Sequence, residues 1–467
     1  MSTRRGFLAG GAAALVAGAA PRALRARSES DVIVIGAGLA GLAAARLLER
    51  AGASVTVIEA EDRVGGRLHT LRQLPGAPEA GGIQVGNGYH RLRRIASKLG
   101  VGLDDGSSAG AGIVQTPGNF YHIKGFGTSS AGWPESRGNT LAEPLRGIEP
   151  ARLAGAFYRH LPQFEAPAAW LDAPAAHDVS LARMLRTNGA GDEAMRLIEA
   201  NLNGNSLEGM SQLHLARTLA IYRSQPGPVS TIAGGSQALP EAMAAALAAE
   251  PRLSTRVAGI EETIESVSIA TQHGVLRAPQ AICTVPFAAL RHIPIASPLP
   301  PPFARMIAGL PYTRASFAYI RARSPFWRED GLPETLWTDD PLIGRVFVLG
   351  DDPAMLKLWT TGAGADMLDR MPEDVAKRAI IGRIEEMRPA ARGQLGEVTL
   401  FSWQKSPSAR GIYHHIGTGI AASLAAATRH EGCRLHFAGE HLAQALSGME
   451  AALESGERAA RLVMQRL

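Results

Sequence analysis

The chain has 467 residues, of which 46% are hydrophobic and 19% are charged, so it is long enough for two or three domains and has the composition of a globular protein. Its net charge of +5 comes from arginines spread along the chain, without a basic run interleaved with aromatic residues, which argues against a nucleic-acid partner. Cys283 and Cys433 lie in apolar, strand-like contexts without metal-ligand spacing. We therefore expect two buried free thiols and no metal site.

The amino-terminal residues have the pattern of a twin-arginine export signal. Arg4 and Arg5 precede Gly-Phe-Leu, a short uncharged run and a small-residue site that ends at Ala19. The uncharged run is shorter than the ~20 residues that a helix needs to cross a membrane, so no stable span is expected once the signal is removed. This export route carries folded proteins, often with a cofactor inside. Residues 1–30 therefore predict a periplasmic or secreted protein, the alternative being a frayed, alanine-rich terminus.

A dinucleotide-binding pattern follows the signal. The segment from Asp31 to Glu59 predicts a strand, a glycine-rich turn, a helix and a second strand. In this pattern Gly36 permits the tight turn, Gly38 lets the backbone approach a pyrophosphate, and Gly41 lets the helix pack on the strand. Glu59 ends the second strand, where its carboxylate can accept hydrogen bonds from both ribose hydroxyls. An acid at this position disfavours the 2′-phosphate of NADP.

Two further glycine motifs follow, Arg63-Val64-Gly65-Gly66-Arg67 and Glu79-Ala80-Gly81-Gly82. With them the sequence resembles the flavin amine oxidases, which belong with the glutathione-reductase-like FAD proteins. The resemblance implies that Gly66 and Arg67 lie along the FAD pyrophosphate, for which arginine is a planar bidentate partner, and that the second glycine pair approaches the flavin. It also implies that the backbone around Val257 meets the adenine. The remaining expected FAD contacts in these segments are Leu39, Ala40, Ala60, Gly81, Gly82 and Ile83.

The resemblance covers nearly all of the mature chain and implies an α/β fold of two interleaved domains. A Rossmann-type FAD-binding domain is expected from residues 31–91, 225–296 and 396–467. An α+β substrate-binding domain is expected from residues 92–224 and 297–395, with a helical insertion at about 143–222.

The substrate half departs from the family pattern at a lysine. In the family, a strand that ends in Phe-Trp carries a lysine that hydrogen-bonds a water at flavin N5. Here the strand ends at Phe326-Trp327, and Phe317 stands where the lysine would be, unless Lys357 supplies it from the neighbouring strand. That lysine is connected with the reaction of reduced flavin with oxygen. Its replacement favours a dehydrogenase that passes electrons to a periplasmic cytochrome or quinone, with oxygen as the alternative acceptor.

The aromatic residues expected beside the flavin are incomplete. The stretch FSWQKSPSARGIYHH matches the family spacing and gives Trp403 and Tyr413 as candidates that sandwich an amine over the ring. Gly448 stands where the second cage aromatic would be. Ile412 occupies the place of the cysteine that bonds flavin covalently in some relatives, which predicts noncovalent FAD. His414 and His415 are candidates for a base or a substrate contact, the alternative being that they are merely hydrogen-bonded.

The chain ends with a short apolar strand that stops at Gly439, followed by Glu440 and then by a helix that starts after Gly448. By resemblance, Gly439 and Glu440 contact FAD. Met449 and Glu450 belong to the start of the last helix, whose amino end would point at the part of the flavin that is negative when reduced.

Together these features predict an exported FAD enzyme that removes a hydride from the carbon next to an amine nitrogen and so gives an imine. A C–C desaturase or an amino-acid oxidase of the same superfamily, or a catalytically decayed FAD-binding partner protein, are the alternatives. Weaker candidates for the pocket or a substrate channel are Gln84, Tyr89, His90, Tyr121 and Trp133.

Overall fold

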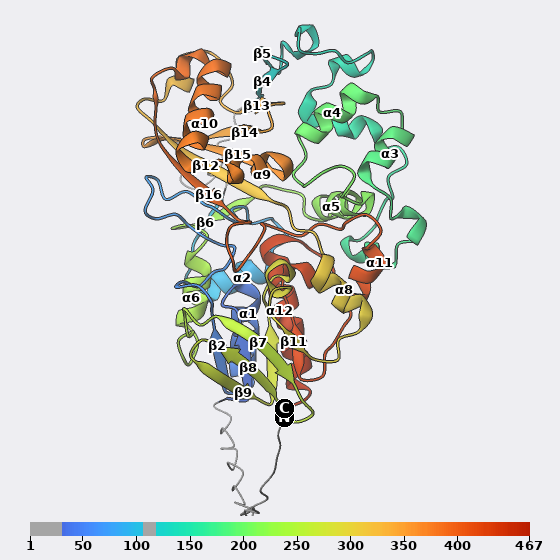
Figure 1. The fold of residues 1–467 in the computed structure, drawn as a ribbon, viewed down its shortest axis with the longest axis vertical. Coiled ribbons are helices and arrows are strands. Elements are labelled where there is room, and N and C mark those ends of the chain that lie inside the picture. The colour runs from blue at the N-terminus through green and yellow to red at the C-terminus, as the bar shows by residue number, and fades with distance from the viewer. Residues whose placement is uncertain (1–29, 106–117) are drawn as a thin grey trace, which may run out of the picture.

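The computed structural model describes residues 30–105 and 118–467. It has two halves, one built on a four-stranded parallel sheet and one on a seven-stranded sheet, with a group of helices beside the second (Figure 1). The predicted signal lies in residues 1–29, outside the described residues. In the part of the chain that the structure describes, no helix is long and apolar enough to cross a membrane.

The parallel sheet has the strand order β17-β10-β1-β2. Its strands are buried almost throughout, as expected of a parallel sheet that is covered on both faces. The three chain segments predicted for the FAD-binding domain each contribute to this sheet. Its members are β1 (Val32–Ile35), β2 (Val55–Ile58), β10 (Gln280–Cys283) and β17 (Leu435–Phe437).

Helices cover one face of the parallel sheet. Val32 and Val34 point into this layer, and the first and last helices, α1 and α12, cross within it. A Cβ atom added to Gly456 would lie 2.1 Å from the carbonyl oxygen of Ala40, so the two helices pack with backbone nearly touching. The helices of this layer are α1 (Leu39–Arg50), α2 (His90–Leu99), α6 (Ala238–Ala245) and α12 (Gly448–Met464).

A smaller sheet and three helices cover the other face, into which Ile33 and Ile35 point. The strand order of this sheet is β11-β7-β8-β9. Its strands are β7 (Val257–Glu262), β8 (Val267–Thr271), β9 (Gly274–Ala278) and β11 (Ile295–Ala296). The helices are α7 (Phe287–Leu290), α8 (Pro301–Gly309) and α11 (Ala421–Thr428).

The substrate half contains the sheet β16-β12-β15-β14-β13-β4-β5. Alternate residues of its central strands face opposite ways: Ala318 and Ile320 pack under helix α10, whereas Phe317 and Tyr319 face the FAD half. Its strands are β4 (Phe120–Ile123), β5 (Phe126–Ser129), β12 (Ala315–Ala322), β13 (Leu336–Thr338), β14 (Arg345–Asp351), β15 (Ala354–Thr361) and β16 (Leu395–Ser402), and the helices α9 (Gly362–Arg370) and α10 (Glu373–Met387) follow β15.

Two of the expected domain limits fall inside elements. The limit between residues 91 and 92 cuts helix α2, and the limit at residue 396 falls in β16, which pairs with β12 in the substrate half. A further small sheet joins β3 (Leu103–Asp105) to β6 (Ser230–Ile232) and so links segments assigned to different halves. Domain limits of this kind depend on strand pairing, which local sequence does not reveal.

The helical insertion forms a compact group with its own apolar core beside the seven-stranded sheet (Figure 1). It contains α3 (Leu181–Thr187), α4 (Asp192–Ala200) and α5 (Gln212–Ser224). Short 3₁₀ helices fill the segments before α3, at residues 133–135, 145–147, 150–157, 167–172 and 175–177, and three more lie at residues 326–328, 389–391 and 440–442.

Candidate cofactor and substrate site

A cavity of about 880 Å³ lies between the two halves. One end is lined by the turn after β1, by Glu59 and by Val257, and the other by Trp359, Trp403 and Tyr413. Of the FAD contacts expected from the sequence, those that line the cavity are Gly36, Gly38, Leu39, Ala40, Glu59, Ala60, Gly66, Arg67, Gly81, Gly82, Ile83, Val257, Gly439, Glu440 and Met449.

The turn between β1 and α1 leaves the amino end of α1 open toward this cavity. Gly36 has φ +106°, a conformation that favours glycine, and a Cβ atom on Gly41 would lie 1.9 Å from the carbonyl oxygen of Gly36. No side chain caps α1, and its first turn carries no acidic residue. Such a helix start offers backbone N–H groups to an anion such as a pyrophosphate.

Glu59 closes the same end of the cavity. Its Oε2 atom accepts a hydrogen bond from the backbone N–H of Ala37 at 2.7 Å, and its Oε1 atom accepts one from Glu61 at 3.0 Å. Burial raises the pKa of Glu59, although these backbone hydrogen bonds oppose the shift. The carboxylate follows the last residue of β2 and lines the cavity, where the sequence pattern predicts a ribose contact.

Arg67 lines the cavity and is held by residues near the carboxyl end of the chain. Its Nη1 atom donates to Glu440 Oε1 at 2.8 Å and to the carbonyl oxygen of Ile412 at 2.9 Å. Glu440 Oε2 in turn pairs with His414 Nδ1 at 2.6 Å. Burial alone would raise the pKa of Glu440, but His414 and Arg67 lower it well below its usual value. The carboxylate is thus a fixed negative charge that orients the arginine.

The segment Glu79–Gly82 runs along the wall of the cavity, and the substrate half holds it by its carbonyl groups. Trp403 Nε1 donates to the carbonyl oxygen of Ala80 at 2.6 Å. The carbonyl oxygen of Glu79 accepts from the Tyr319 hydroxyl at 2.8 Å and from Lys357 Nζ at 2.7 Å. A Cβ atom on Gly81 would lie 1.8 Å from the carbonyl oxygen of Arg67, so only glycine fits there.

Phe317 and Lys357 both lie behind the cavity wall. Phe317 is fully buried and packs against Trp359 with ring centroids 4.9 Å apart, and it does not line the cavity. Lys357 does not line it either: its Nζ atom lies 4.3 Å from the Phe317 ring centroid and 2.7 Å from its Glu79 acceptor. Burial lowers the pKa of Lys357 to about 7, with Glu79 opposing the shift. Phe317 was predicted to be a catalytic residue, but it lies behind the cavity wall and does not contact a ligand bound in the cavity.

The aromatic end of the cavity holds Trp403 and Tyr413 as expected, together with Trp359, which the sequence did not single out. Trp359 lies directly opposite Phe317 in the pairing of β12 with β15, and alternation from the buried Lys357 is the signal that would have found it. The Tyr413 hydroxyl donates to the backbone oxygen of Asn203 at 3.4 Å, and burial raises its pKa to about 12.

Gly448 lines this end as well, with φ +64°. A Cβ atom added to it would lie 2.9 Å from the hydroxyl oxygen of Tyr89, so the space of the expected second cage aromatic is partly taken by that tyrosine. Gln84 lines the cavity, whereas Tyr89 and His90 do not.

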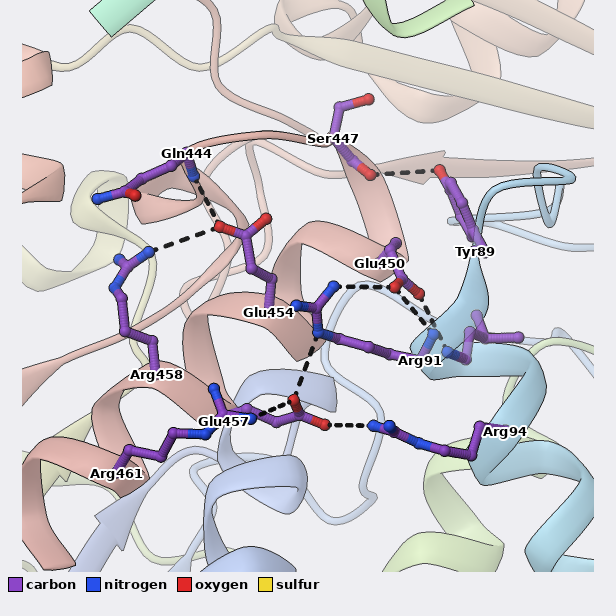
Figure 2. A network of polar contacts seen from close by, with 11 residues as sticks. Tyr89, Arg91, Arg94, Gln444, Ser447, Glu450, Glu454, Glu457, Arg458 and Arg461 are labelled. Atoms are coloured by element: carbon purple, nitrogen blue, oxygen red, sulfur yellow. Dashed lines mark hydrogen bonds and ion pairs between the residues drawn. The ribbon is translucent and has the colours of Figure 1, made fainter. Parts of the chain in front are cut away.

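Glu450 was predicted to contact FAD, and this is wrong. Its side chain points away from the cavity to the start of α2, where Oε1 accepts from the backbone N–H of Arg91 at 2.9 Å and Oε2 from that of Leu92 at 3.0 Å. Figure 2 shows this contact within a network that joins α12 to α2. Met449, one residue earlier, faces the cavity instead.

Several weaker candidates are structural. Tyr121 and Trp133 are fully buried and donate to Glu149 and to the carbonyl oxygen of Ile148, so neither lines a channel. His414 and His415 are buried and hydrogen-bonded and do not line the cavity. Cys283 is buried as expected, but Cys433 is exposed, because its strand begins two residues later. Among residues 30–105 and 118–467 no cluster could hold a metal ion.

The residues fit FAD. The cavity is lined by an uncapped helix start with an acid beside it, by Arg67 and by aromatic rings. Where the predicted pyrophosphate passes, a Cβ atom on Gly38 would meet its nearest neighbour at 3.9 Å, so protein packing does not require glycine there, whereas Gly66 has φ +55°, a conformation that itself favours glycine. Their lack of side chains keeps this part of the cavity open for a ligand.

Fold and site together define a two-domain oxidoreductase with a dinucleotide cofactor. The family described as flavin containing amine oxidoreductase matches residues 39–464, and the chain belongs to this family. Membership implies FAD.

Known proteins agree with this assignment. The putative flavin-containing monoamine oxidase AofH of Mycobacterium tuberculosis is 29% identical over 72% of this chain and 75% of its own length. The flavin-dependent L-tryptophan oxidase RebO of Lentzea aerocolonigenes is 27% identical over 94% of this chain and 98% of its own. The solved cyclohexylamine oxidase from Brevibacterium oxydans covers 94% of this chain and 99% of its own with a TM-score of 0.75, and at 24% identity this likeness concerns the fold.

Proposed function

We propose that this chain is an exported enzyme that holds FAD without a covalent bond and oxidises an amine at the carbon next to its nitrogen. The product is an imine, which hydrolyses in water. The observation that carries this proposal is the junction of the glycine-rich, Arg67-containing part of the cavity with an end walled by Trp359, Trp403 and Tyr413. An amine is suited to such an end, because aromatic faces attract cations and accept apolar chains.

FAD, when bound, supplies the acceptor of the hydride that leaves the substrate carbon. The chain's own residues position the substrate and exclude water. Tyr413 stays a neutral hydroxyl at physiological pH, since burial raises its pKa to about 12, and it is therefore not a base. A base is not needed when the amine binds neutral, because the nitrogen lone pair assists departure of the hydride.

The noncovalent attachment is inferred from Ile412, which lines the cavity at the place of the cysteine of some relatives. Neither cysteine of the chain lines the cavity. Acid precipitation of the purified protein should release the yellow colour into the supernatant. Colour that stays with the pellet would contradict this part of the proposal.

For the electron acceptor we propose a cytochrome or quinone rather than oxygen. Phe317 replaces the family's lysine, and Lys357 is engaged with the carbonyl oxygen of Glu79 behind the wall. Reduced enzyme mixed with air-saturated buffer in a stopped-flow instrument should reoxidise too slowly to sustain turnover. Fast reoxidation would overturn the dehydrogenase proposal, and its loss in Lys357→Met would then identify that lysine as the substitute.

Export rests on the Arg4-Arg5 pair and the short uncharged run after it. Replacing both arginines with lysine should leave the protein in the cytoplasm. Unchanged export of this double variant would refute the twin-arginine proposal without bearing on the chemistry.

The chemistry itself is tested by anaerobic bleaching of the flavin with primary, secondary and cyclic amines, amino acids and apolar alkenes. Bleaching by at least one amine or amino acid is expected. Bleaching by alkenes alone would replace the proposal with C–C desaturation, and an absence of bleaching by any compound would favour a decayed FAD-binding protein. Amino acids belong in the panel because one relative is named an L-tryptophan oxidase.

A further inference from the structure

A second cavity, of about 40 Å³, lies in the helical layer of the FAD half. Its lining comes from the four helices α1, α2, α6 and α12, and none of its residues lines the larger cavity described above. The volume corresponds to roughly three water molecules at about 10–15 Å³ each. A small polar ligand therefore fits there, whereas an organic cofactor does not.

The polar lining of this second cavity is mostly positive. Arg46 and Arg50 come from α1, Arg94 and Lys98 come from α2, and the carboxylate of Glu457 on α12 is the acid among the lining residues. Arg46 is buried, whereas the other three cations are exposed. Arg46 thus lies deepest among these positive charges.

Glu457 does not balance this charge, because three arginines already share it. Its Oε1 atom pairs with Arg94 at 3.0 Å, and its Oε2 atom pairs with Arg461 at 3.1 Å and with Arg91 at 3.4 Å (Figure 2). Arg91 and Arg461 do not line the second cavity. The cavity therefore keeps an excess of positive charge.

Arg46 has no partner for its charge. It is 9% exposed, forms no hydrogen bond or ion pair with any residue that the structure describes, and its Nη1 atom is fully buried. Burial lowers its pKa, the charge of Arg50 adds to the shift, and Glu49 opposes it. Arg50 stands in the last turn of α1, where the helix dipole favours a cation, but Arg46 stands one turn earlier. A buried guanidinium without a partner is unfavourable.

The lack of an acid does not by itself distinguish Arg46. Arg217 and Arg345 also form no ion pair within the described ranges, but each donates to an oxygen of the protein. Arg217 donates to the carbonyl oxygen of Leu446 at 2.7 Å, and Arg345 donates to the side-chain oxygen of Asn203. Arg46 differs from both because it lacks any acceptor and lines a cavity in which one can lie.

We propose that the second cavity binds the phosphate group of a small solute, either inorganic phosphate or a phosphate monoester, against Arg46 and the three exposed cations around it. A phosphate group carries about 1.5 to 2 negative charges at neutral pH and has several acceptor oxygens. A guanidinium donates to two such oxygens at once, which a single-atom anion such as chloride does not allow. Because the site joins four helices of the FAD half, its ligand would stabilise that half.

The first test is calorimetric titration of the holoenzyme with inorganic phosphate, glycerol 3-phosphate and acetate, at equal ionic strength set with sodium chloride. Phosphate or its ester should bind more tightly than acetate, and the tighter of the two identifies the free ion or the ester as the ligand. Arg46→Met should weaken this binding by about tenfold or more. Lys98→Met, at an exposed position of the lining, should weaken it less. Arg321→Met, at an exposed position on β12, is the matched control and should not change it.

The second test is thermal unfolding of the same proteins in chloride and in phosphate. Phosphate also stabilises proteins in general, because it is excluded from their surfaces, so the quantity of interest is the gain relative to Arg321→Met. In chloride, Arg46→Met should unfold at the same temperature as the unaltered protein or higher, since it removes an unpaired buried charge. In phosphate, the unaltered protein and Arg321→Met should gain roughly 2 °C more than Arg46→Met.

A purely structural role of Arg46 predicts the opposite pattern. Arg46→Met would then be destabilised in chloride, and Lys98→Met would bind phosphate as tightly as the unaltered protein. That pattern, or an affinity for phosphate and its ester no higher than that for acetate, would overturn the proposal. Because the two cavities share no residue, either outcome leaves the proposed amine oxidation to be decided by flavin bleaching alone.

Discussion

Lys357 donates a hydrogen bond from Nζ to the carbonyl oxygen of Glu79 at a distance of 2.7 Å. The contact joins the seven-stranded sheet of the substrate half to the segment that runs along the cavity wall. The amine is fully buried and surrounded by the rings of Phe317, Tyr319 and Trp359. Because this lysine holds the wall segment by a hydrogen bond, the stability of that contact depends on whether the lysine is protonated.

The stability of the protein should therefore depend on pH through Lys357. Its pKa is lowered from 10.5 to about 7 in the folded protein, so between these values the unfolded chain binds the proton and the folded chain does not. Stability then rises with pH across this window, by up to about 1.4 kcal/mol per pH unit from this group.

Lys357→Met should remove that rise. Urea unfolding of both proteins at pH 7, 8 and 9 measures it: the free energy of unfolding of the original protein, relative to the variant, should increase with pH. A constant difference across the three pH values would show that the lysine stays charged in its buried place.

Gly41→Ala should destroy the cofactor site. The added Cβ atom would lie 1.9 Å from the carbonyl oxygen of Gly36, a backbone atom that cannot move without opening the turn. We expect purified Gly41→Ala to contain little or no FAD, judged by the absorbance ratio of flavin to protein. Gly382→Ala in α10 is the control, since nothing lies within 4 Å of its new Cβ atom, and it should keep full FAD content and gain about 0.5–1 kcal/mol. Normal flavin content in Gly41→Ala would contradict the close packing of α1 on the turn.

Glu450→Gln should destabilise the fold and leave FAD in place. The buried carboxylate accepts the backbone N–H groups of Arg91 and Leu92, and an amide can accept at one atom only, so the expected loss is about 1–3 kcal/mol. Glu457→Gln, which removes ion pairs to the partly exposed arginines 91, 94 and 461, should lose less than about 1 kcal/mol. Thermal unfolding and flavin content are measured for both. Loss of FAD from a folded Glu450→Gln protein would indicate that Glu450 does contribute to cofactor binding.

Glu440→Gln should weaken FAD binding. The change removes the charge that orients Arg67 and pairs with His414, and charge-assisted hydrogen bonds are each worth about 1.5–3 kcal/mol, so a loss of at least tenfold in affinity is expected. Titration of the apoprotein with FAD, followed by quenching of flavin fluorescence, gives the affinity. Glu454→Gln is the matched control: Glu454 accepts from the backbone N–H of Gln444 at 3.0 Å and does not line the cavity. Equal losses in both variants would mean that the network acts on stability alone.

The cofactor half could be predicted from the sequence because its motifs are local. Gly36, Gly38 and Gly41 encode one turn, and together with the flanking strands and helix their spacing predicts a pyrophosphate at the start of α1. Glu59 follows from the same unit. Such local features can be predicted without knowing which strands pair.

The substrate end depends on long-range pairing, and there the sequence was less informative. Trp359 reaches the site through the register of β15 and β12, which no local pattern specifies. Glu450 was misassigned for a different reason: adjacent residues of a helix point about 100° apart, so Met449 faces the cavity and its neighbour faces α2. Phe317 lies on the correct face of its strand, but Trp359 forms the wall in front of it.

The crossing of α1 with α12 has a consequence for the order in which this protein is made. The ribosome delivers Ala40 more than four hundred residues before Gly456, the residue that packs against it, which at about 5–20 residues per second is a delay of roughly 20 to 80 seconds. During that time the first strand and helix of the nucleotide half exist without β17 and α12. A chain that ends before α12 therefore lacks part of the cavity wall, including Gly448 and Met449. We expect FAD to bind tightly only after translation has finished.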